Sequence, residues 1–409
     1  MKVWVKYLIG IAIGVACALI LPVDNPSVSS AISFILDIVL RFGKYMVVPL
    51  LFTSVAIAVN KLRSSKLLLK TSIWTAVIIV LSSLMLTIIG LLSIIIVKLP
   101  RIPITVDQVT DAYSLEIPNL IRSLFPSSAF GAILEGSFLL VHFLFAFLVG
   151  WESCTESNAF RPVVALLDSL SKLFYGISTF FTEFLSIGMI AVMVDWTIRF
   201  RSVWASGIYT PMILMFIVDF IIVAGLIYPA ILYYLCHDPH PYRVPFASLT
   251  SMFVAFLGGD INLTLPLNIR HGKESLGIRR RISGYTYPLY SIFARGGSAL
   301  VVVISFIVVW RSYSSLAITV KDVAWIFASA FGLSFLLGGL PSGGAFVLLA
   351  ILCTSYSKGF EQSFLLLKPA APIICSFAAL FDVVTSMFGS YIVGVQTKMI
   401  EHHTVAHFI

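Results

Sequence analysis

Long apolar segments alternate with short polar ones along the whole chain, and this pattern predicts a series of membrane-spanning helices. About 20 apolar residues are enough to cross the hydrocarbon core of a bilayer as a helix. Eight segments fit this description, and the predicted helices are 4–22, 31–60, 71–97, 131–151, 162–197, 205–236, 284–310 and 363–398. We expect the first to be retained as a helix rather than removed as a signal peptide.

Two further apolar segments are interrupted in the middle by glycine and proline. Segment 244–269 contains "GGDINLTLP", and segment 323–357, which carries no charge, contains "GGLPSGG". The positive-inside rule places the basic stretches 61–70 and 270–281 in the cytoplasm. Segment 244–269 then has cytoplasmic residues on both sides, so we expect a re-entrant hairpin. The alternative, a pair of kinked spanning helices, would place the basic stretch 270–281 outside.

The second half of the chain is therefore predicted to repeat one unit, a hairpin followed by a helix, in two opposite orientations. Two broken segments at corresponding positions of an inverted repeat indicate a transporter site near the bilayer midplane. Glycine and proline free backbone groups that are tolerated at this depth only inside protein or beside a wet cavity. The residues predicted to form the gate tips are Gly259, Asp260, Pro341 and Gly344.

The composition agrees with an all-α polytopic membrane protein. The chain is 59% hydrophobic and 11% charged, with a mean hydropathy of +1.01, whereas soluble domains carry about 25% charged residues. We attribute the net charge of +8 to loops that face the cytoplasm and anionic lipid, and we expect no nucleic-acid partner. The five cysteines are scattered, and neither they nor any enzyme motif predicts a metal site, a cofactor or a catalytic residue.

Three isolated charges lie in the apolar segments of the second half: Asp260, Arg295 and Asp382. Each costs about 2.5–3.5 kcal/mol at the centre of a membrane helix, so such residues pair, line a cavity or bind a charged ligand. One alternative is a salt bridge that only fixes packing. Two aspartates and one arginine sum to −1, so a single pair leaves one carboxylate, which could be protonated or could face a substrate ammonium group.

Two glycines directly follow the buried arginine, and they predict a break in helix 284–310 at Gly296 and Gly297. A broken helix exposes the N–H groups of its second half, which favour anionic groups. The tip residues Ser342 and Gly343 would act in the same way at the second hairpin. Uncharged donors near these breaks are Asn262, Thr264, Ser298, Ser342, Thr385 and Ser386.

The order of these parts resembles the dicarboxylate/amino-acid:cation symporter family, the glutamate transporter homologues. The stretch "AFLGGDINLTLPLNIRHGKESLGI" is similar to the first hairpin of the family, and "FLLGGLPSGGAFVLLAIL" is similar to the second. "VLRFGKYMVVPLLFTSV", "SSAFGAILEG" and "YPLYSIFARGGSAL" resemble the signatures of its helices 2, 4 and 7. The resemblance covers nearly the whole chain. It implies a glutamate-transporter-like, elevator-type fold with eight transmembrane helices and two opposed re-entrant hairpins.

The resemblance also implies two parts of the chain with different roles. Residues 1–236 would be mainly scaffold, trimerisation and peripheral helices, with the third and sixth helices moving with the transport domain. Residues 244–400 would form the core transport domain: hairpin, helix, hairpin and helix. The protein would be a homotrimer.

The site departs from the family pattern. Ala294, Arg295 and Gly296 stand where the family has N-M-D, so the asparagine and aspartate that help bind sodium are absent. Asp382 matches the aspartate that binds the substrate amino group in the family. Thr385 stands at the position of the arginine that binds the side-chain carboxylate of the substrate, and Val393 at that of a sodium-ligating aspartate. Sodium coupling and glutamate recognition are therefore not expected, and proton coupling, exchange or uniport is favoured.

We therefore expect a transporter of the inner membrane, with both termini cytoplasmic, that moves a small amino acid or dicarboxylate by an elevator mechanism. Asp382 would bind a substrate amino group, and Arg295 would be a counter-ion or a carboxylate ligand. Asp260 would take part in charge balance or coupling. The expected substrate-binding residues are Asp382, Arg295, Thr385, Ser386, Asn262, Ser342, Gly343 and Ser298. The alternatives are a proton- or sodium-coupled dicarboxylate or glutamate symporter and an anion-conducting channel.

Overall fold

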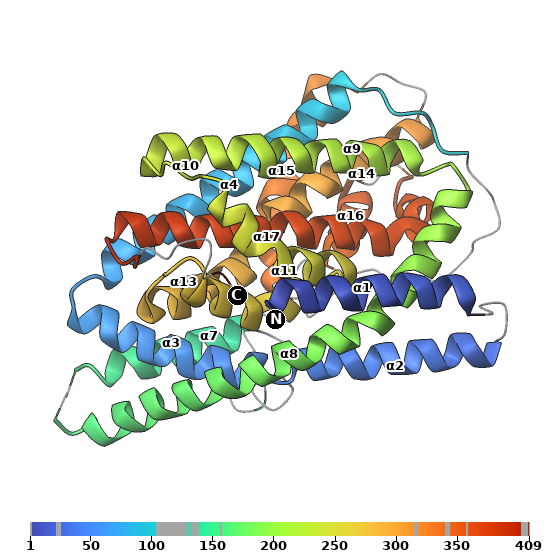
Figure 1. Cartoon of the computed structure of the whole chain (residues 1–409). Helices are drawn as coiled ribbons and strands as arrows, with labels where there is room; N and C mark the ends of the chain where they lie inside the picture. Colours follow the sequence, from blue (N-terminus) through green and yellow to red (C-terminus); the bar gives the residue numbers. More distant parts are fainter. Residues whose placement is uncertain are drawn as a thin grey trace.

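A computed structural model describes residues 2–21, 26–103, 128, 131, 139–155, 158–314, 318–339, 344–356, 359–401 and 408 of the chain. The named elements of these residues are all helices, and Figure 1 shows their arrangement. Their bounds are α1 Val3–Ile20, α2 Pro26–Lys44, α3 Val47–Ser64, α4 Leu68–Ile96, α7 Leu139–Glu152, α8 Arg161–Ala205, α9 Thr210–Phe220, η1 Ile221–Ile227, α10 Tyr228–Cys236, α11 Arg243–Gly258, η2 Asn262–Thr264, α12 Leu265–Glu274, α13 Arg280–Phe293, α14 Gly296–Tyr313, α15 Val320–Ser334, η3 Phe335–Gly339, α16 Gly344–Tyr356, η4 Ser363–Ala370 and α17 Ala371–Gln396.

Eight helical stretches of the described residues are long and apolar enough to cross a membrane. They are not the same eight that the sequence predicted. Val320–Gly338, expected as one arm of the second hairpin, meets the criterion, whereas the predicted helix 131–151 is described only as α7, Leu139–Glu152, and is shorter. Both predicted hairpin segments are interrupted helices: α11 ends at Gly258 and α12 begins at Leu265, while α15 and η3 end at Gly339 and α16 begins at Gly344.

The predicted helix 31–60 is two helices, α2 and α3, separated at Tyr45 and Met46. The reason lies at Pro49, the third residue of α3. Proline has no N–H and clashes with the preceding turn, so it is tolerated only in the first turn of a helix. A helix that includes Pro49 must therefore restart shortly before it. The break leaves Lys44 at the C-terminal end of α2.

The packed core lies around α14 and α17. In the stretch Arg280–Tyr313, 94% of the most apolar 18-residue window is buried, against 28% for α1. Helix α14 packs on α4, α16 and α17, while α1 packs on α8 and α3 on α7. Figure 1 shows α17 in the middle of the molecule, between α9 and α10 on one side and α3 and α8 on the other.

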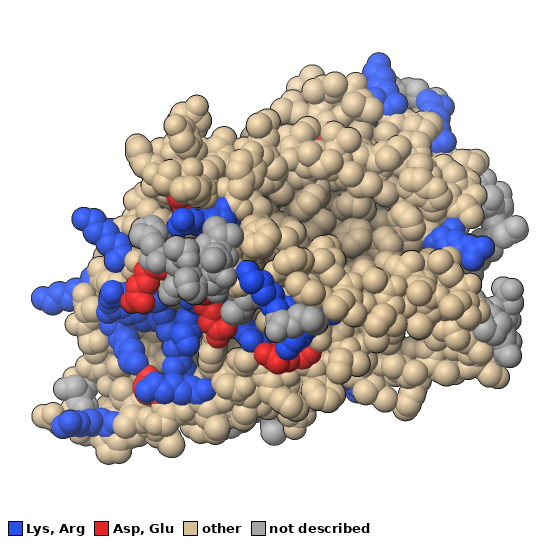
Figure 2. Space-filling view, viewed as in Figure 1, with Lys and Arg blue, Asp and Glu red and all other residues tan. Residues whose placement is uncertain are grey.

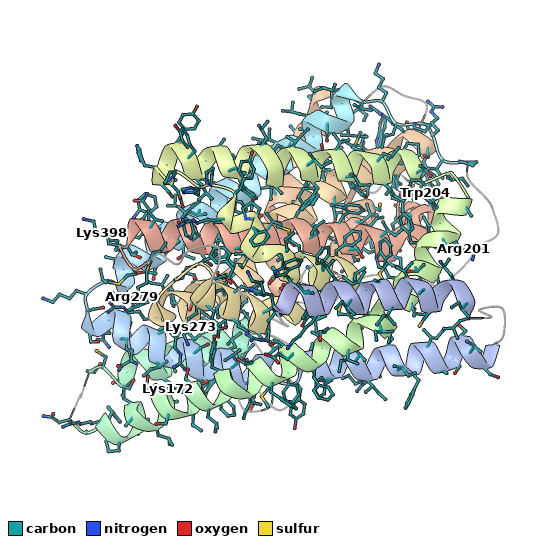
Figure 3. The ribbon with its side chains drawn as sticks, in the orientation of Figure 1. Lys172, Arg201, Trp204, Lys273, Arg279 and Lys398 are labelled. Atoms are coloured by element: carbon teal, nitrogen blue, oxygen red, sulfur yellow. The ribbon has the colours of Figure 1, made fainter. Side chains whose placement is uncertain are left out.

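The outer surface is largely apolar, and most of its charged side chains lie toward one end. Large apolar side chains of the outer helices are exposed, for example Leu81, Ile96 and Phe180, as expected where lipid rather than water covers a protein. Figure 2 shows lysine, arginine and acidic residues concentrated on one part of the surface. Figure 3 places Lys172, Lys273, Arg279 and Lys398 toward that end, and Arg201 at the opposite one.

The break in the predicted helix 284–310 lies at Ala294 and Arg295, between α13 and α14, and the two glycines begin α14. The sequence prediction placed the break on the glycines themselves. Their role is close packing. A Cβ atom at Gly296 would lie 2.5 Å from the Cα atom of Ser83 on α4, and one at Gly297 would lie 2.2 Å from the Cβ atom of Phe381 on α17. The start of α14 is thus wedged between two helices.

Gly297→Ala should therefore destabilise the protein. The added methyl group must displace the backbone of α14 or α17, and overpacking of this kind costs about 1–3 kcal/mol or more. We expect a lower thermal midpoint of the detergent-purified protein, measured by size-exclusion chromatography after heating. Gly176→Ala on α8 is the matched control, because its added Cβ would meet no described atom within 4 Å beyond its chain neighbours and the adjacent backbone of its own helix. An unchanged midpoint for Gly297→Ala would contradict this packing account.

Candidate functional site

Asp382 is held at the N-terminal end of α14. Its Oδ1 atom accepts hydrogen bonds from the N–H groups of Gly297 (2.7 Å) and Ser298 (3.2 Å), and its Oδ2 atom accepts one from Ser298 Oγ (2.7 Å). The side chain is fully buried in α17. The partial positive charge of a helix N-terminus stabilises a carboxylate in this position. The anionic group that the broken helix was predicted to attract is thus one of the protein's own.

Asp260 lies between α11 and η2, and it has two partners. Its Oδ1 atom accepts a hydrogen bond from the N–H group of Asn262 (2.9 Å), which fixes the turn at the tip. Its Oδ2 atom lies 2.7 Å from Nζ of Lys44, the last residue of α2. The Asp260 side chain is 5% exposed and that of Lys44 is 37% exposed. The sequence analysis missed Lys44 as a site residue. Its charge within the predicted helix 31–60 was a signal, but Asp37 and Arg41 carry charges there as well, and sequence alone does not show which carboxylate Lys44 meets.

Arg295 lies between the two half-helices α13 and α14 and is 8% exposed. Within the described part of the chain its side chain makes no hydrogen bond and has no carboxylate oxygen within 4.0 Å, and its buried Nε atom is without a hydrogen-bond partner. Asp382 and Asp260 attract the guanidinium group electrostatically, but a buried cation that forms no direct ion pair or hydrogen bond is still costly. Arg295 is therefore the charge of this site that can still gain a partner.

These three charged residues line one small polar cavity. Of the predicted site residues, it is lined by Gly259, Asp260, Arg295, Ser298, Gly344 and Asp382. The lining residues that the prediction missed are Leu337, Ala345, Cys375, Ala378 and Ala379. Cys375, Ala378 and Ala379 precede Asp382 by seven, four and three residues, so the helical period could have found them.

The cavity has a volume of about 20 Å³, which is enough for about one water molecule. An amino acid is several times larger. A substrate can therefore occupy this place only after the lining segments have moved apart.

Three further predicted site residues, Thr385, Ser386 and Asn262, do not line the cavity. Thr385 donates to the carbonyl oxygen of Phe381 (2.8 Å), and its hydroxyl lies 2.6 Å from that of Tyr228. Ser386 is fully buried, and its hydroxyl has no hydrogen-bond partner among the described residues. Asn262 is buried beside the tip, with Oδ1 equally without one. Pro341, Ser342 and Gly343 lie outside the described residues.

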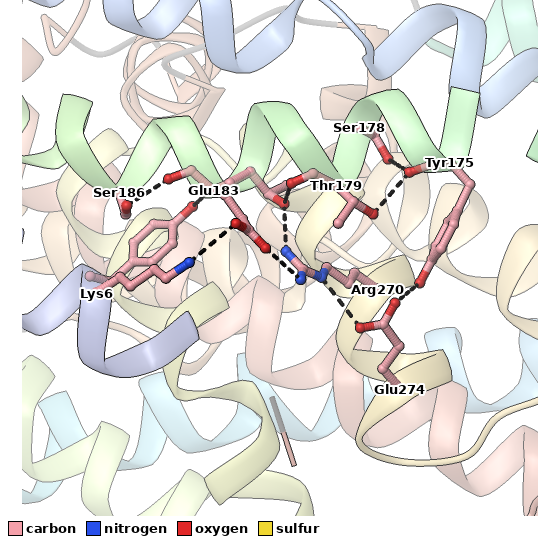
Figure 4. A network of polar contacts seen from close by, with 10 residues as sticks. Lys6, Tyr175, Ser178, Thr179, Glu183, Ser186, Arg270 and Glu274 are labelled. Atoms are coloured by element: carbon pink, nitrogen blue, oxygen red, sulfur yellow. Dashed lines mark hydrogen bonds and ion pairs between the residues drawn. The ribbon is translucent and has the colours of Figure 1, made fainter. Parts of the chain in front are cut away.

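A second set of charges connects α1, α8 and α12 (Figure 4). Arg270 contacts Glu183 (Nη2–Oε1, 3.1 Å), Glu274 (Nε–Oε2, 3.4 Å) and the hydroxyl of Thr182 (3.1 Å). Lys6 adds a second cation at Glu183 (Nζ–Oε2, 3.1 Å). Two cations thus face two carboxylates, and this set is balanced within the protein. It links α12 to the N-terminal half and leaves no charge open for a ligand.

The comparisons with known proteins agree with this architecture. Residues 3–395 match the sodium:dicarboxylate symporter family. The serine/threonine transporter SstT of Enterococcus faecalis is 25% identical over 236 residues, which are 55% of this chain and 52% of that transporter. The neutral amino acid transporters B(0) of Bos taurus and Homo sapiens are 27% and 26% identical over 128 residues, 31% of this chain and 24% of theirs.

The chain thus spans about half, or less, of the length of the curated relatives that it matches. These relatives are transporters and not enzymes, as the sequence analysis predicted. The match and the apolar helices identify a multi-pass membrane protein. Because the family match runs from residue 3 to residue 395, the chain belongs to the sodium:dicarboxylate symporter family.

Proposed function

We propose that this protein is a secondary transporter of small neutral amino acids that works without sodium. The observation that supports this most directly is the guanidinium group of Arg295, which lines the cavity and has no carboxylate within 4.0 Å among the described residues. The group is planar and can bind a carboxylate with two parallel hydrogen bonds. A substrate carboxylate would supply the partner that the buried cation lacks.

The charge count favours a zwitterion. Lys44 and Arg295 contribute +2 and Asp260 and Asp382 contribute −2, so the site sums to zero. This revises the sum of −1 expected from Asp260, Arg295 and Asp382 alone, because that sum did not include Lys44. A neutral amino acid leaves the sum at zero, with its carboxylate at Arg295 and its ammonium group toward Asp382, whereas a dicarboxylate brings −2. A loaded site with zero net charge needs no added ion to cross the membrane, because no net charge then moves through the low-dielectric hydrocarbon core.

The similar proteins also support a neutral amino acid as the substrate. Their names describe transport of serine and threonine in one case and of neutral amino acids in the others. The resemblance to glutamate transporter homologues adds that Thr385 stands in place of the arginine that would bind a second substrate carboxylate. Here Thr385 contacts Tyr228 instead. A dicarboxylate or glutamate symporter remains the second candidate, because the family is named for such substrates.

Access to the cavity requires movement at its tips, and an elevator is the movement that we propose. The segments 244–269 and 323–357 would be re-entrant hairpins whose tips, at Gly259 and Asp260 and at Gly344, separate to admit the substrate. The ion pair between Lys44 and Asp260 would break when the first tip moves. In this proposal residues 244–400 carry the site past a trimeric scaffold built mainly from residues 1–236, in the inner membrane and with both termini cytoplasmic.

Uptake into proteoliposomes tests this function. We expect radiolabelled serine, threonine or alanine to be taken up and exchanged in potassium buffers without sodium, at rates that a potassium diffusion potential does not change. Aspartate and succinate should not compete. A steep dependence on sodium or on a proton gradient would contradict sodium-free neutral transport, and competition by succinate would favour the dicarboxylate symporter. A current that needs no substrate would indicate an anion channel.

Lys44→Met should make transport depend on a cation. Without the lysine, the buried Asp260 carboxylate loses the cation that contacts it directly, and the site sums to −1. A proton or sodium ion must then enter with the substrate, because an uncompensated buried carboxylate costs several kcal/mol. We expect uptake by Lys44→Met that is slow at neutral pH, faster at acidic pH or in sodium, and sensitive to membrane potential. Arg41→Met is the matched control, since Arg41 pairs with Asp37 on the exposed side of α2. Unaltered pH and sodium dependence in Lys44→Met would remove Lys44 from the charge balance.

A further inference from the structure

A second cavity, far from the candidate site in sequence and in lining, lies where the C-terminal ends of α4 and α14 meet. Its volume is about 530 Å³, within the usual range of small-molecule sites. One wall is apolar and consists of Ile95, Leu99, Ile307, Trp310, Ile318 and Val323. The other residues are Ser314 and three cations, Lys98, Arg101 and Arg311, and no acidic residue is among those that the structure describes here.

The location of these cations is unusual for a membrane protein. The basic stretch 61–70 precedes α4, and Lys98 and Arg101 follow the other end of this 29-residue helix, about 44 Å away along its axis. The positive-inside rule explains basic residues at one end of a spanning helix, but not at both ends. The partial negative charge at the C-terminal end of α14 favours Arg311. It does not explain why Lys98 and Arg101 lie at this end of α4.

The charges of this cluster are not neutralised by described carboxylates. Arg311 Nη1 is buried without a hydrogen-bond partner in the described residues, and Nη2 makes only a long contact, 3.4 Å, to the carbonyl oxygen of Ile94. Asp322, next to the cavity residue Val323, is engaged at the start of α15 by the hydroxyl of Thr319 (2.6 Å) and by that of Tyr356 (2.9 Å). A buried donor of a charged group that lacks a partner costs more than a neutral one, so an anionic ligand is favoured.

We propose that this cavity binds one anionic phospholipid. Its phosphate lies among Lys98, Arg101 and Arg311, and part of an acyl chain lies along the apolar wall. A free inorganic anion would use the cations but not the wall, and an uncharged lipid would use the wall but not the cations. The exposed, apolar Ile95 and Ile96 beside the cavity give an acyl chain an open path from the surrounding bilayer.

Lipid retention by the full-length protein tests this site. The purified, delipidated protein is titrated in detergent with phosphatidylglycerol or with phosphatidylcholine of the same acyl chains, and bound lipid is counted by native mass spectrometry. We expect tighter binding of phosphatidylglycerol. The triple variant Lys98→Gln/Arg101→Gln/Arg311→Gln should weaken it by about fivefold per cation removed. Lys70→Gln/Arg161→Gln/Arg201→Gln, a change of three exposed basic residues elsewhere, should leave it unchanged.

Three outcomes would overturn the proposal. The first is equal affinity for the two lipids, or an unaffected triple variant. The second is displacement of phosphatidylglycerol by millimolar inorganic phosphate, which would assign the cations to a free anion. The third is binding only after Asp107→Asn/Asp111→Asn/Glu116→Gln, because the chain's own carboxylates would then be the partners. If the triple variant does not fold, Val323→Trp, which keeps every charge and fills the cavity, should lower retention.

Discussion

Arg295→Met should abolish measurable substrate binding and still yield a folded protein. Removing one member of a buried charge pair at an interface costs about 2–5 kcal/mol, which corresponds to about 30- to 4,000-fold in Kd. In the proposed site the pair forms only when the substrate carboxylate arrives. The stability of the protein without substrate should therefore not depend on the guanidinium group. In the variant, Asp382 keeps its three hydrogen bonds from α14, and Asp260 keeps its ion pair with Lys44.

Binding and thermal stability measured on the same preparation separate the two roles that the sequence left open. If Arg295 is a substrate ligand, the variant loses the rise in thermal midpoint that substrate gives to the wild type, while its midpoint without substrate is unchanged or higher. If Arg295 only balances the aspartates, the midpoint without substrate falls and the affinity of the remaining folded protein is kept. Arg295→Lys retains the charge but not the planar fork, so we expect an intermediate affinity. Arg201→Met, at an exposed arginine, controls for the loss of one cation.

The sequence alone singles out three of the charged residues that line the cavity. A charged residue in a long apolar segment is expensive, so Asp260, Arg295 and Asp382 stand out without any structural knowledge, and the structure places all three around one cavity. The small apolar residues on the other walls carry no such signal. Ala378 and Ala379 look like ordinary residues of a packed helix, and only their spacing from Asp382 relates them to the site.

Lys44 and the glycines show what sequence reasoning lacks. Lys44 is visible in the sequence as a charge within the predicted helix 31–60, but its contact with Asp260 joins residues 216 positions apart by their numbering, and no local pattern encodes such a pair. Gly296 and Gly297 led to the prediction of a helix break at these two residues. In the structure the break lies just before them, at Ala294 and Arg295. They are not the break, but the surface against which Ser83 and Phe381 pack. Which helices approach each other closely depends on the three-dimensional packing, and the pattern of a single sequence does not show it.

Asp382→Ala should be the most destabilising single change in the site. The substitution leaves the N–H groups of Gly297 and Ser298 and the hydroxyl of Ser298 without their acceptor, and each unsatisfied buried group costs about 1–3 kcal/mol. It also removes one of the two carboxylates that face the cavity with Arg295. A total near the upper end of single-mutation effects, about 4–5 kcal/mol, is a large part of the stability of a typical protein. We expect little folded protein to survive detergent extraction.

The physical cause can be tested by comparing substitutions at the same position and by rescue. Asp382→Asn keeps an oxygen for the two N–H groups and should recover more folded protein than Asp382→Ala. Ser386→Ala is the matched control on α17, since its buried hydroxyl has no hydrogen-bond partner within the described chain, and its midpoint should stay close to the wild type. Adding Arg295→Met to Asp382→Ala should raise the yield and midpoint, because the unbalanced cation is then gone. If the double variant is no better than Asp382→Ala alone, the two charges do not interact, and Asp382 serves only to hold the start of α14.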